Sequence, residues 1–162
     1  MKHGKRLPDR RRIERGLFLD QTFRRLIFTL LLSLAWASTG ASQESVKIPL
    51  YIKQIEIRVE VAKTPEQRTV GLMGRDHLGK DEGMFFIFET EDFHSFWMKD
   101  TRIPLSIAFI DKDGKIVRIT DMKPLTLESH PPPKRILYAL EMNKGWFLAH
   151  GIKVGDILRF SK

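Results

Sequence analysis

The chain of 162 residues contains no cysteine. This absence excludes a disulfide scaffold, a thiol nucleophile, CxxC redox chemistry and cysteine ligation of zinc or an iron–sulfur cluster. The sequence also has no G-x-x-x-x-G-K-[ST] or G-x-G-x-x-G phosphate-binding motif and no G-x-S-x-G nucleophile elbow. The usual sequence marks of nucleotide binding and of serine or cysteine nucleophiles are therefore missing.

The formal net charge is +8, from 28 Lys and Arg against 20 Asp and Glu. Residues 1–37 hold nine of the basic residues and three of the acidic ones, so their net charge is +6. The remaining 125 residues carry a net charge of only +2. Because the basic excess belongs to the N-terminal segment, composition gives no support for nucleic acid as a partner.

An apolar run of 12 residues, 26–37, follows the basic pair Arg24-Arg25. Small residues follow the run, with one A-x-A site ending at Ala37 and a second small-residue exit at Ala41. The pattern predicts an export signal and cleavage region over residues 1–41. The run is shorter than the ~20 residues that span a bilayer, so we expect membrane contact only through the signal. After cleavage near Ala37 or Ala41, the protein is predicted to be periplasmic or extracellular.

Residues 42–162 are predicted to form a single domain of short strands. Residues 55–61 alternate strictly between apolar and charged side chains, which is typical of a half-buried strand. Thr64, Pro65 and Gln67 form a capping box that opens a helix to about residue 73. The other expected strands are 48–52, 83–88, 94–99, 105–110, 115–120, 135–141 and 157–160, with a second helix from 143 to 150. This order predicts a mainly β (α+β) fold, either a strongly bent antiparallel sheet or a small barrel of seven or eight strands with two short helices.

From about residue 59 to residue 160 the chain resembles the DUF192 family of small domains. The matching segments, in order along the chain, are RTVGLM (68–73), EGMFF (82–86), FWMKDTRIPL (96–105), LEMNKGW (140–146) and GIKVGD (151–156). The family's central segment usually reads W-M-K-N-T-x-I-P-L-D, whereas this chain has Asp100 and Ser106 in place of its Asn and its last Asp. The resemblance implies a barrel-like, mainly β fold and frequent export. It implies no reaction.

A polar pocket is one hypothesis for the functional site. Lys99 and Glu141 each end an otherwise apolar predicted strand, and a charge at a core-facing position needs a partner or a ligand. We expect the two side chains to meet at one end of the barrel, either as a structural ion pair or as part of a pocket. Trp146 is either a core residue or the floor of that pocket. The candidate ligand-binding residues are Arg68, Trp97, Lys99, Asp100, Glu141 and Trp146, with no catalytic residue and no cofactor.

Two alternatives remain at this point. His94 and Met98 could bind a soft metal such as Cu(I), although buried methionines are more often ordinary core residues. Asp100 and Glu141 could serve a carboxylate-dependent hydrolase, which needs two carboxyl groups with separated pKa values. We expect a non-catalytic, exported binding module whose partner is a small ligand or a protein of the cell envelope.

Overall fold

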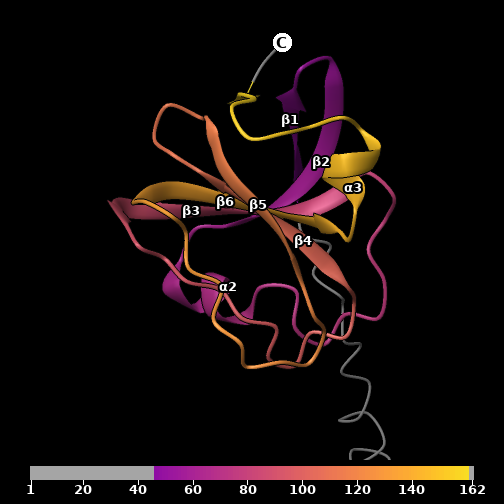
Figure 1. Ribbon diagram of the computed structural model, residues 1–162. Coiled ribbons are helices and arrows are strands. Elements are labelled where there is room, and N and C mark those ends of the chain that lie inside the picture. The colour runs from indigo at the N-terminus through magenta and orange to yellow at the C-terminus, as the bar shows by residue number, and fades with distance from the viewer. Residues whose placement is uncertain (1–45, 161–162) are drawn as a thin grey trace, which may run out of the picture. The chain divides into compact units, whose positions relative to one another are not determined.

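The structure, a computed structural model, describes residues 46–160 (Figure 1). The export signal predicted for residues 1–41 lies outside the described residues. Within residues 46–160, no helix has the length and the apolar content needed to cross a membrane.

Seven strands and two short helices make up the described domain. The helices are α2 (Pro65–Val70) and α3 (Trp146–Ala149). The strands are β1 (Lys47–Ile52), β2 (Ile55–Ala62), β3 (Glu82–Asp92), β4 (Leu105–Ile110), β5 (Ile116–Met122), β6 (Ile136–Asn143) and β7 (Leu158–Arg159). They form one sheet in the order β5-β4-β6-β3-β2-β1-β7.

The sheet is mixed and curled into a half-barrel. All neighbouring strands pair antiparallel except β2 and β3, which pair parallel because α2 lies in the connection between them. The two ends of the sheet approach each other, since Lys115 forms a β-bridge with Ile157 and the Leu158 amide donates to the Gly114 carbonyl at 2.8 Å. The prediction of a mainly β, strongly bent sheet with two short helices is confirmed, with one parallel pair in place of a fully antiparallel sheet.

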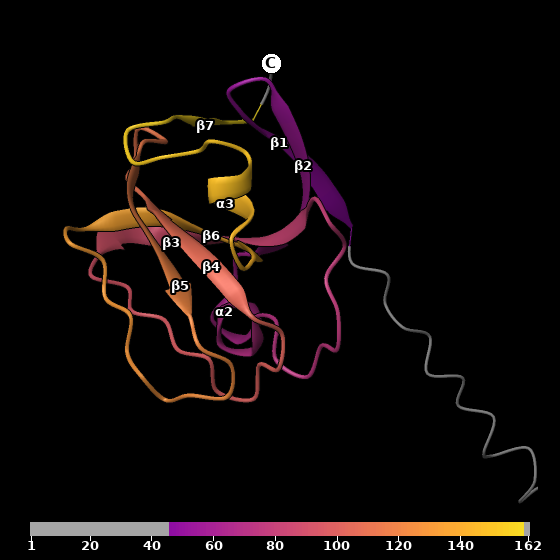
Figure 2. The ribbon, with the colours of Figure 1, turned by 45° about the vertical axis from the view of Figure 1, so that its right-hand side comes forward.

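Each face of the sheet carries its own hydrophobic core. The α3-side cluster lies within the curve and includes Phe85, Leu140 and Trp146. The α2-side cluster covers the other face and includes Phe86, Met98 and Ile107. Figure 2 shows the two helices on opposite sides of the central strands. Because β4 and β6 are covered on both faces, even an acidic side chain on β6 is held away from solvent.

The strand predicted over residues 94–99 is not part of the sheet. This segment is a strap across the α2-side face, and it pairs with the loop 125–130 instead of with the sheet. Phe96 and His130 exchange backbone hydrogen bonds, and the Met98 amide donates to the Thr126 carbonyl. Alternation along the strap still holds, since Phe96 packs inward and Met98 is fully buried while Trp97 is exposed.

Candidate functional site

A pocket of about 410 Å³ opens on the α2-side face of the sheet. Its walls come from α2 and the turn after it, from β3, from the strap and Thr101 just after it, and from β6. The lining residues are Pro65, Arg68, Thr69, Val70, Gly71, Leu72, Met73, Phe86, Phe88, His94, Ser95, Phe96, Trp97, Thr101 and Glu141. The volume lies within the range of small-molecule sites.

Helix α2 forms one wall, and its local sequence explains its position. Thr64 and Gln67 make the predicted capping box, with the Thr64 hydroxyl accepting from the Gln67 amide at 3.2 Å. The helix ends at Val70, earlier than predicted, because Gly71 takes a positive φ of 49° that breaks the helical path. The short helix brings Arg68 against β3.

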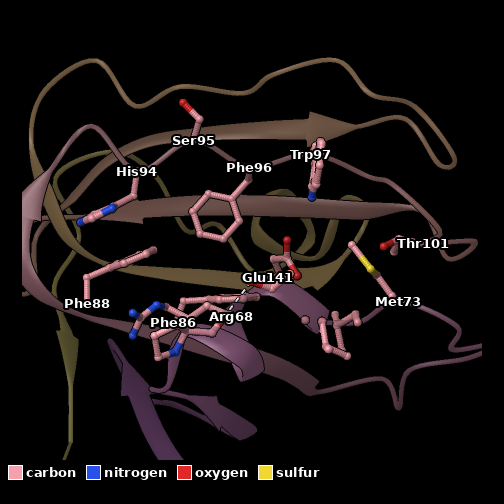
Figure 3. Close-up of a pocket in the computed structure, with 15 residues that line it drawn as sticks. Arg68, Met73, Phe86, Phe88, His94, Ser95, Phe96, Trp97, Thr101 and Glu141 are labelled. Atoms are coloured by element: carbon pink, nitrogen blue, oxygen red, sulfur yellow. Dashed lines mark hydrogen bonds between the residues drawn. The ribbon is translucent and has the colours of Figure 1, made fainter.

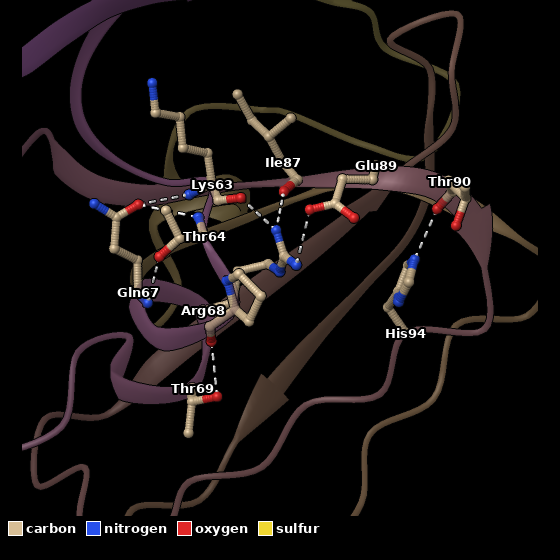
Figure 4. Close-up of polar contacts among 10 residues, drawn as sticks. Lys63, Thr64, Gln67, Arg68, Thr69, Ile87, Glu89, Thr90 and His94 are labelled. Carbon is tan, nitrogen blue, oxygen red and sulfur yellow. Dashed lines mark hydrogen bonds and ion pairs between the residues drawn. The ribbon is translucent and has the colours of Figure 1, made fainter.

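Arg68 is a clasp between α2 and β3 (Figure 4). Its guanidinium donates to the carbonyl oxygens of Lys63 and Ile87, the latter at 2.9 Å. A Glu89 carboxylate oxygen lies 3.9 Å away, and the guanidinium stands 5.2 Å from the centre of the Phe88 ring. Because its guanidinium group contacts all of these partners, we infer that Arg68 holds α2 against β3 in one wall of the pocket.

Glu141 stands at the base of the pocket. It lies inside β6, between Met84 of β3 and Ile107 of β4, which are its cross-strand neighbours. The residue is 5% exposed, and within residues 46–160 its carboxyl group has neither a hydrogen-bond nor an ion-pair partner. Burial raises the pKa of Glu141 to about 8. The group is therefore mostly a neutral carboxylic acid at pH 7, able to donate one hydrogen bond into the pocket.

Aromatic rings surround this carboxyl group (Figure 3). Phe96 packs edge-on against Phe86, with ring centres 5.0 Å apart, and edge-on against Phe88 at 6.1 Å. The Trp97 side chain is 48% exposed and lines the pocket beside Phe96. Figure 3 shows the Glu141 carboxyl group pointing into the space between the strap and Phe86. The site is thus a pocket of aromatic, aliphatic and polar side chains with an ionisable carboxyl group at its base.

The structure brings together Arg68, Trp97 and Glu141 and places Lys99 elsewhere. The predicted contact between Lys99 and Glu141 is wrong. Lys99 is exposed, and its ammonium group lies 5.7 Å from the centre of the Trp97 ring. The reason is the strap: with Phe96 and Met98 packed inward, alternation turns Trp97 and Lys99 outward.

Asp100 and Ser106, the two departures from the family pattern, form hydrogen bonds within the fold and lie outside the pocket. Asp100 is exposed with a positive φ of 52°, a conformation that Asn and Asp tolerate better than most residues. Its carbonyl accepts from the Gly74 amide at 2.9 Å. Ser106 is fully buried; its hydroxyl donates to Asp121 at 2.6 Å and accepts from the Gly145 amide at 2.8 Å. Asp100 does not line the pocket, so the predicted pairing of Asp100 with Glu141 in one site is wrong.

Trp146 is also outside the pocket. It belongs to the α3-side cluster, on the opposite face of the sheet from Glu141. Its indole N–H donates to the Asp81 carboxylate at 2.9 Å, and its ring stacks on His150 with centres 4.2 Å apart. The core interpretation of Trp146 is the one that fits this position.

His94 and Met98, the candidate metal ligands, have different surroundings. Met98 is fully buried in the α2-side cluster and does not line the pocket. His94 lines the pocket and stacks on Phe88 with ring centres 3.6 Å apart, and its Nε2 lies 2.9 Å from the Thr90 carbonyl. That carbonyl can only accept, so Nε2 carries a proton. In the described part of the chain, no group of three His, Asp or Glu side chains is placed to hold a metal ion.

Sequence reasoning missed most of the pocket wall. Phe86, Phe88, Phe96 and Met73 all line it. Phe86 and Phe88 share one face of β3 by alternation, which sequence could indicate. Phe96 joins them only because the strap crosses that face, and nothing in the local sequence fixes this crossing.

The comparisons with known proteins define the class. The profile of the DUF192 family, whose members are described as uncharacterised, matches residues 49–160. This chain belongs to that family. A comparison with curated proteins found no match.

Two crystal structures are similar to this chain. One is of a candidate transcription regulator from Sinorhizobium meliloti 1021, with 32% identity and a TM-score of 0.66 over 70% of this chain and 91% of that one. The other is of a protein of unknown function from Novosphingobium aromaticivorans DSM 12444, with 31% identity and a TM-score of 0.69 over 74% of this chain and 89% of that one. These similarities extend to the whole fold.

Proposed function

We propose that this protein is an exported, non-catalytic module that binds a small ligand in the α2-side pocket. The observation that carries the proposal is Glu141, a residue that is 5% exposed and whose carboxyl group lines the pocket without a hydrogen-bond or ion-pair partner within residues 46–160. A carboxyl group in such a poorly hydrated place is stabilised in its ionised form only by a partner of opposite charge or by hydrogen-bond donors. A ligand that reaches Glu141 would supply the missing partner.

The surroundings of Glu141 support binding over catalysis. Among the described residues, Glu141 is the only one with a carboxyl group that lines the pocket, whereas carboxylate-based hydrolysis needs two such groups with separated pKa values. The wall combines aromatic and aliphatic side chains with the polar side chains of Thr69, Ser95 and Thr101, which could orient a bound molecule. Export is supported by the basic and apolar segments within residues 1–37.

A fragment screen by two-dimensional amide NMR tests the binding proposal. Fragments at millimolar concentration are expected to shift amides near Phe86, Phe96 and Glu141. The change Ser95→Trp places a large ring at an exposed position that lines the pocket, and it should weaken this binding at least about tenfold.

The matched control adds the same ring far from the pocket. Leu148 is 85% exposed on α3, on the other face of the sheet, so Leu148→Trp should leave fragment binding unchanged. If no fragment from a library of several hundred shifts the pocket amides, or if Ser95→Trp leaves binding intact, the proposal is wrong.

A further inference from the structure

The charges of the pocket determine which ligand it can hold. The ionisable lining residues are Arg68 from α2, His94 from the strap and Glu141 from β6. The side chains that flank Glu141 from β3 and β4, Met84 and Ile107, are not ionisable. The balance of charge inside the pocket is therefore set by these three groups.

Arg68 offers little to an anionic ligand. Its Nη1 donates to two backbone carbonyls, and its Nη2 faces Glu89 at 3.9 Å. Its cation also stands over Phe88. An anion entering the pocket would have to compete with these partners and would meet aromatic rings, whose faces are electronegative.

Once Glu141 is ionised, its charge and that of Glu89 beside Arg68 outweigh the single positive charge of Arg68, and the pocket then favours a cation. A cation near the base of the pocket would gain a carboxylate partner, because Glu141 can ionise on binding and release its proton to solvent. Phe86, Phe96 and Trp97 line the same pocket, and aromatic rings attract organic cations. The apolar part of an organic cation would meanwhile cover the aliphatic and aromatic wall.

We propose that the ligand is an organic ammonium ion whose nitrogen binds at Glu141 and whose apolar part packs on the surrounding rings. This inference rests on the proposed function, since it specifies the ligand class of the same pocket. Binding exchanges one cation for one proton: Glu141 loses its proton to solvent and its carboxylate pairs with the ammonium group. No covalent bond is formed or broken besides that O–H bond.

Isothermal titration of the purified chain with three isosteric probes tests the inference. The probes are choline, the neutral 3,3-dimethylbutan-1-ol and the anionic 3,3-dimethylbutanoate. Because the ammonium charge of choline does not titrate, its affinity should follow the ionisation of Glu141. Affinity is expected to rise about tenfold from pH 6 to pH 7 and about fivefold from pH 7 to pH 8, and to level off above pH 9. Repeating the titration in buffers of different ionisation heat should show release of about one proton per choline at pH 7.

The change Glu141→Gln isolates the carboxyl group while His94 stays in place. It should remove the pH dependence assigned to Glu141 and weaken choline binding at pH 9 at least about tenfold, because the charge–charge attraction between the carboxylate and the quaternary nitrogen is lost. The control is Phe93→Ala, at an aromatic residue that is 55% exposed and does not line this pocket. It should leave all three affinities unchanged.

The outcomes separate this inference from the proposed function. If the alcohol or the carboxylate binds the pocket as tightly as choline at pH 9, the ammonium inference is wrong and the binding module stands. The ammonium inference is also wrong, and the binding module stands, if choline does not bind although NMR fragments occupy the pocket. If no probe and no fragment binds, both proposals are wrong.

Discussion

The unpartnered carboxyl group at the base of the pocket predicts an unusual dependence of stability on pH. In the unfolded chain, Glu141 releases its proton near its ordinary pKa of 4.5, whereas the folded chain retains the proton until about pH 8. Between these values the folded state binds more protons than the unfolded state. The contribution of Glu141 to stability is therefore present below pH 4.5 and falls as pH rises.

The magnitude follows from the two pKa values. The free energy of unfolding should fall by roughly 1.4 kcal/mol per pH unit through most of this range because of Glu141, or about 5 kcal/mol in total. Glu141→Gln keeps the size of the side chain and cannot ionise. Relative to the parent, the variant should gain about 4 kcal/mol between pH 4.5 and pH 9.

Urea unfolding of the parent and the variant at pH steps from 4.5 to 9 measures the difference directly. Taking the difference cancels the titration of the other groups, provided they behave alike in both proteins. The matched control is Glu128→Gln, at an exposed carboxyl group, which should change stability by less than about 0.5 kcal/mol. A difference between parent and Glu141→Gln that stays constant with pH would refute the reasoning.

Three further predictions concern Arg68, Lys99 and the N-terminal residues 1–37. Arg68→Ala should reduce the free energy of unfolding by about 2–3 kcal/mol, because two backbone carbonyls lose a charged donor. The control is Arg102→Ala, which removes an exposed ion pair with Asp76. It should reduce the free energy of unfolding by less than about 1 kcal/mol in the same urea experiment. Lys99→Ala should change the free energy of unfolding by less than about 0.5 kcal/mol, since Lys99 is exposed and does not pair with Glu141. A loss several times larger would indicate that Lys99 does form an ion pair with Glu141. Protein recovered outside the cytoplasm should lack residues 1–37 by intact mass, and aspartates at Leu31 and Leu32 should block its export; recovery of the full-length mass there would contradict cleavage.

Much of the fold could be predicted because its strands follow simple rules. The alternation of residues 55–59 and the capping box at Thr64 both appear in the structure where the sequence indicates them, whereas Glu60 is buried and paired with Arg75. The sequence of the strap predicts a strand because inward packing of Phe96 and Met98 produces the same alternation as a sheet edge. The side chains alone do not reveal whether their backbone pairs with a strand or with a loop.

The site was only partly predictable for a related reason. Glu141 could be recognised as a charge among apolar residues, and this required only local sequence. Its neighbours are set by which elements cover that face of β6, a tertiary feature. Lys99 looked equivalent to Glu141 in sequence, yet one faces solvent and the other faces the pocket because the strap and β6 differ in how they pack.

A pH titration of the Glu141 side-chain carboxyl carbon by ¹³C NMR, with and without choline, tests the central claim most directly. The free protein should give a midpoint of about 8, because burial without a partner disfavours the ionised form. Saturating choline should lower that midpoint, because the ammonium ion binds the carboxylate. A midpoint near 4.5 in the free protein would show that Glu141 is not a buried, unpartnered acid. A midpoint that choline leaves unchanged would show that no ammonium ion pairs with it.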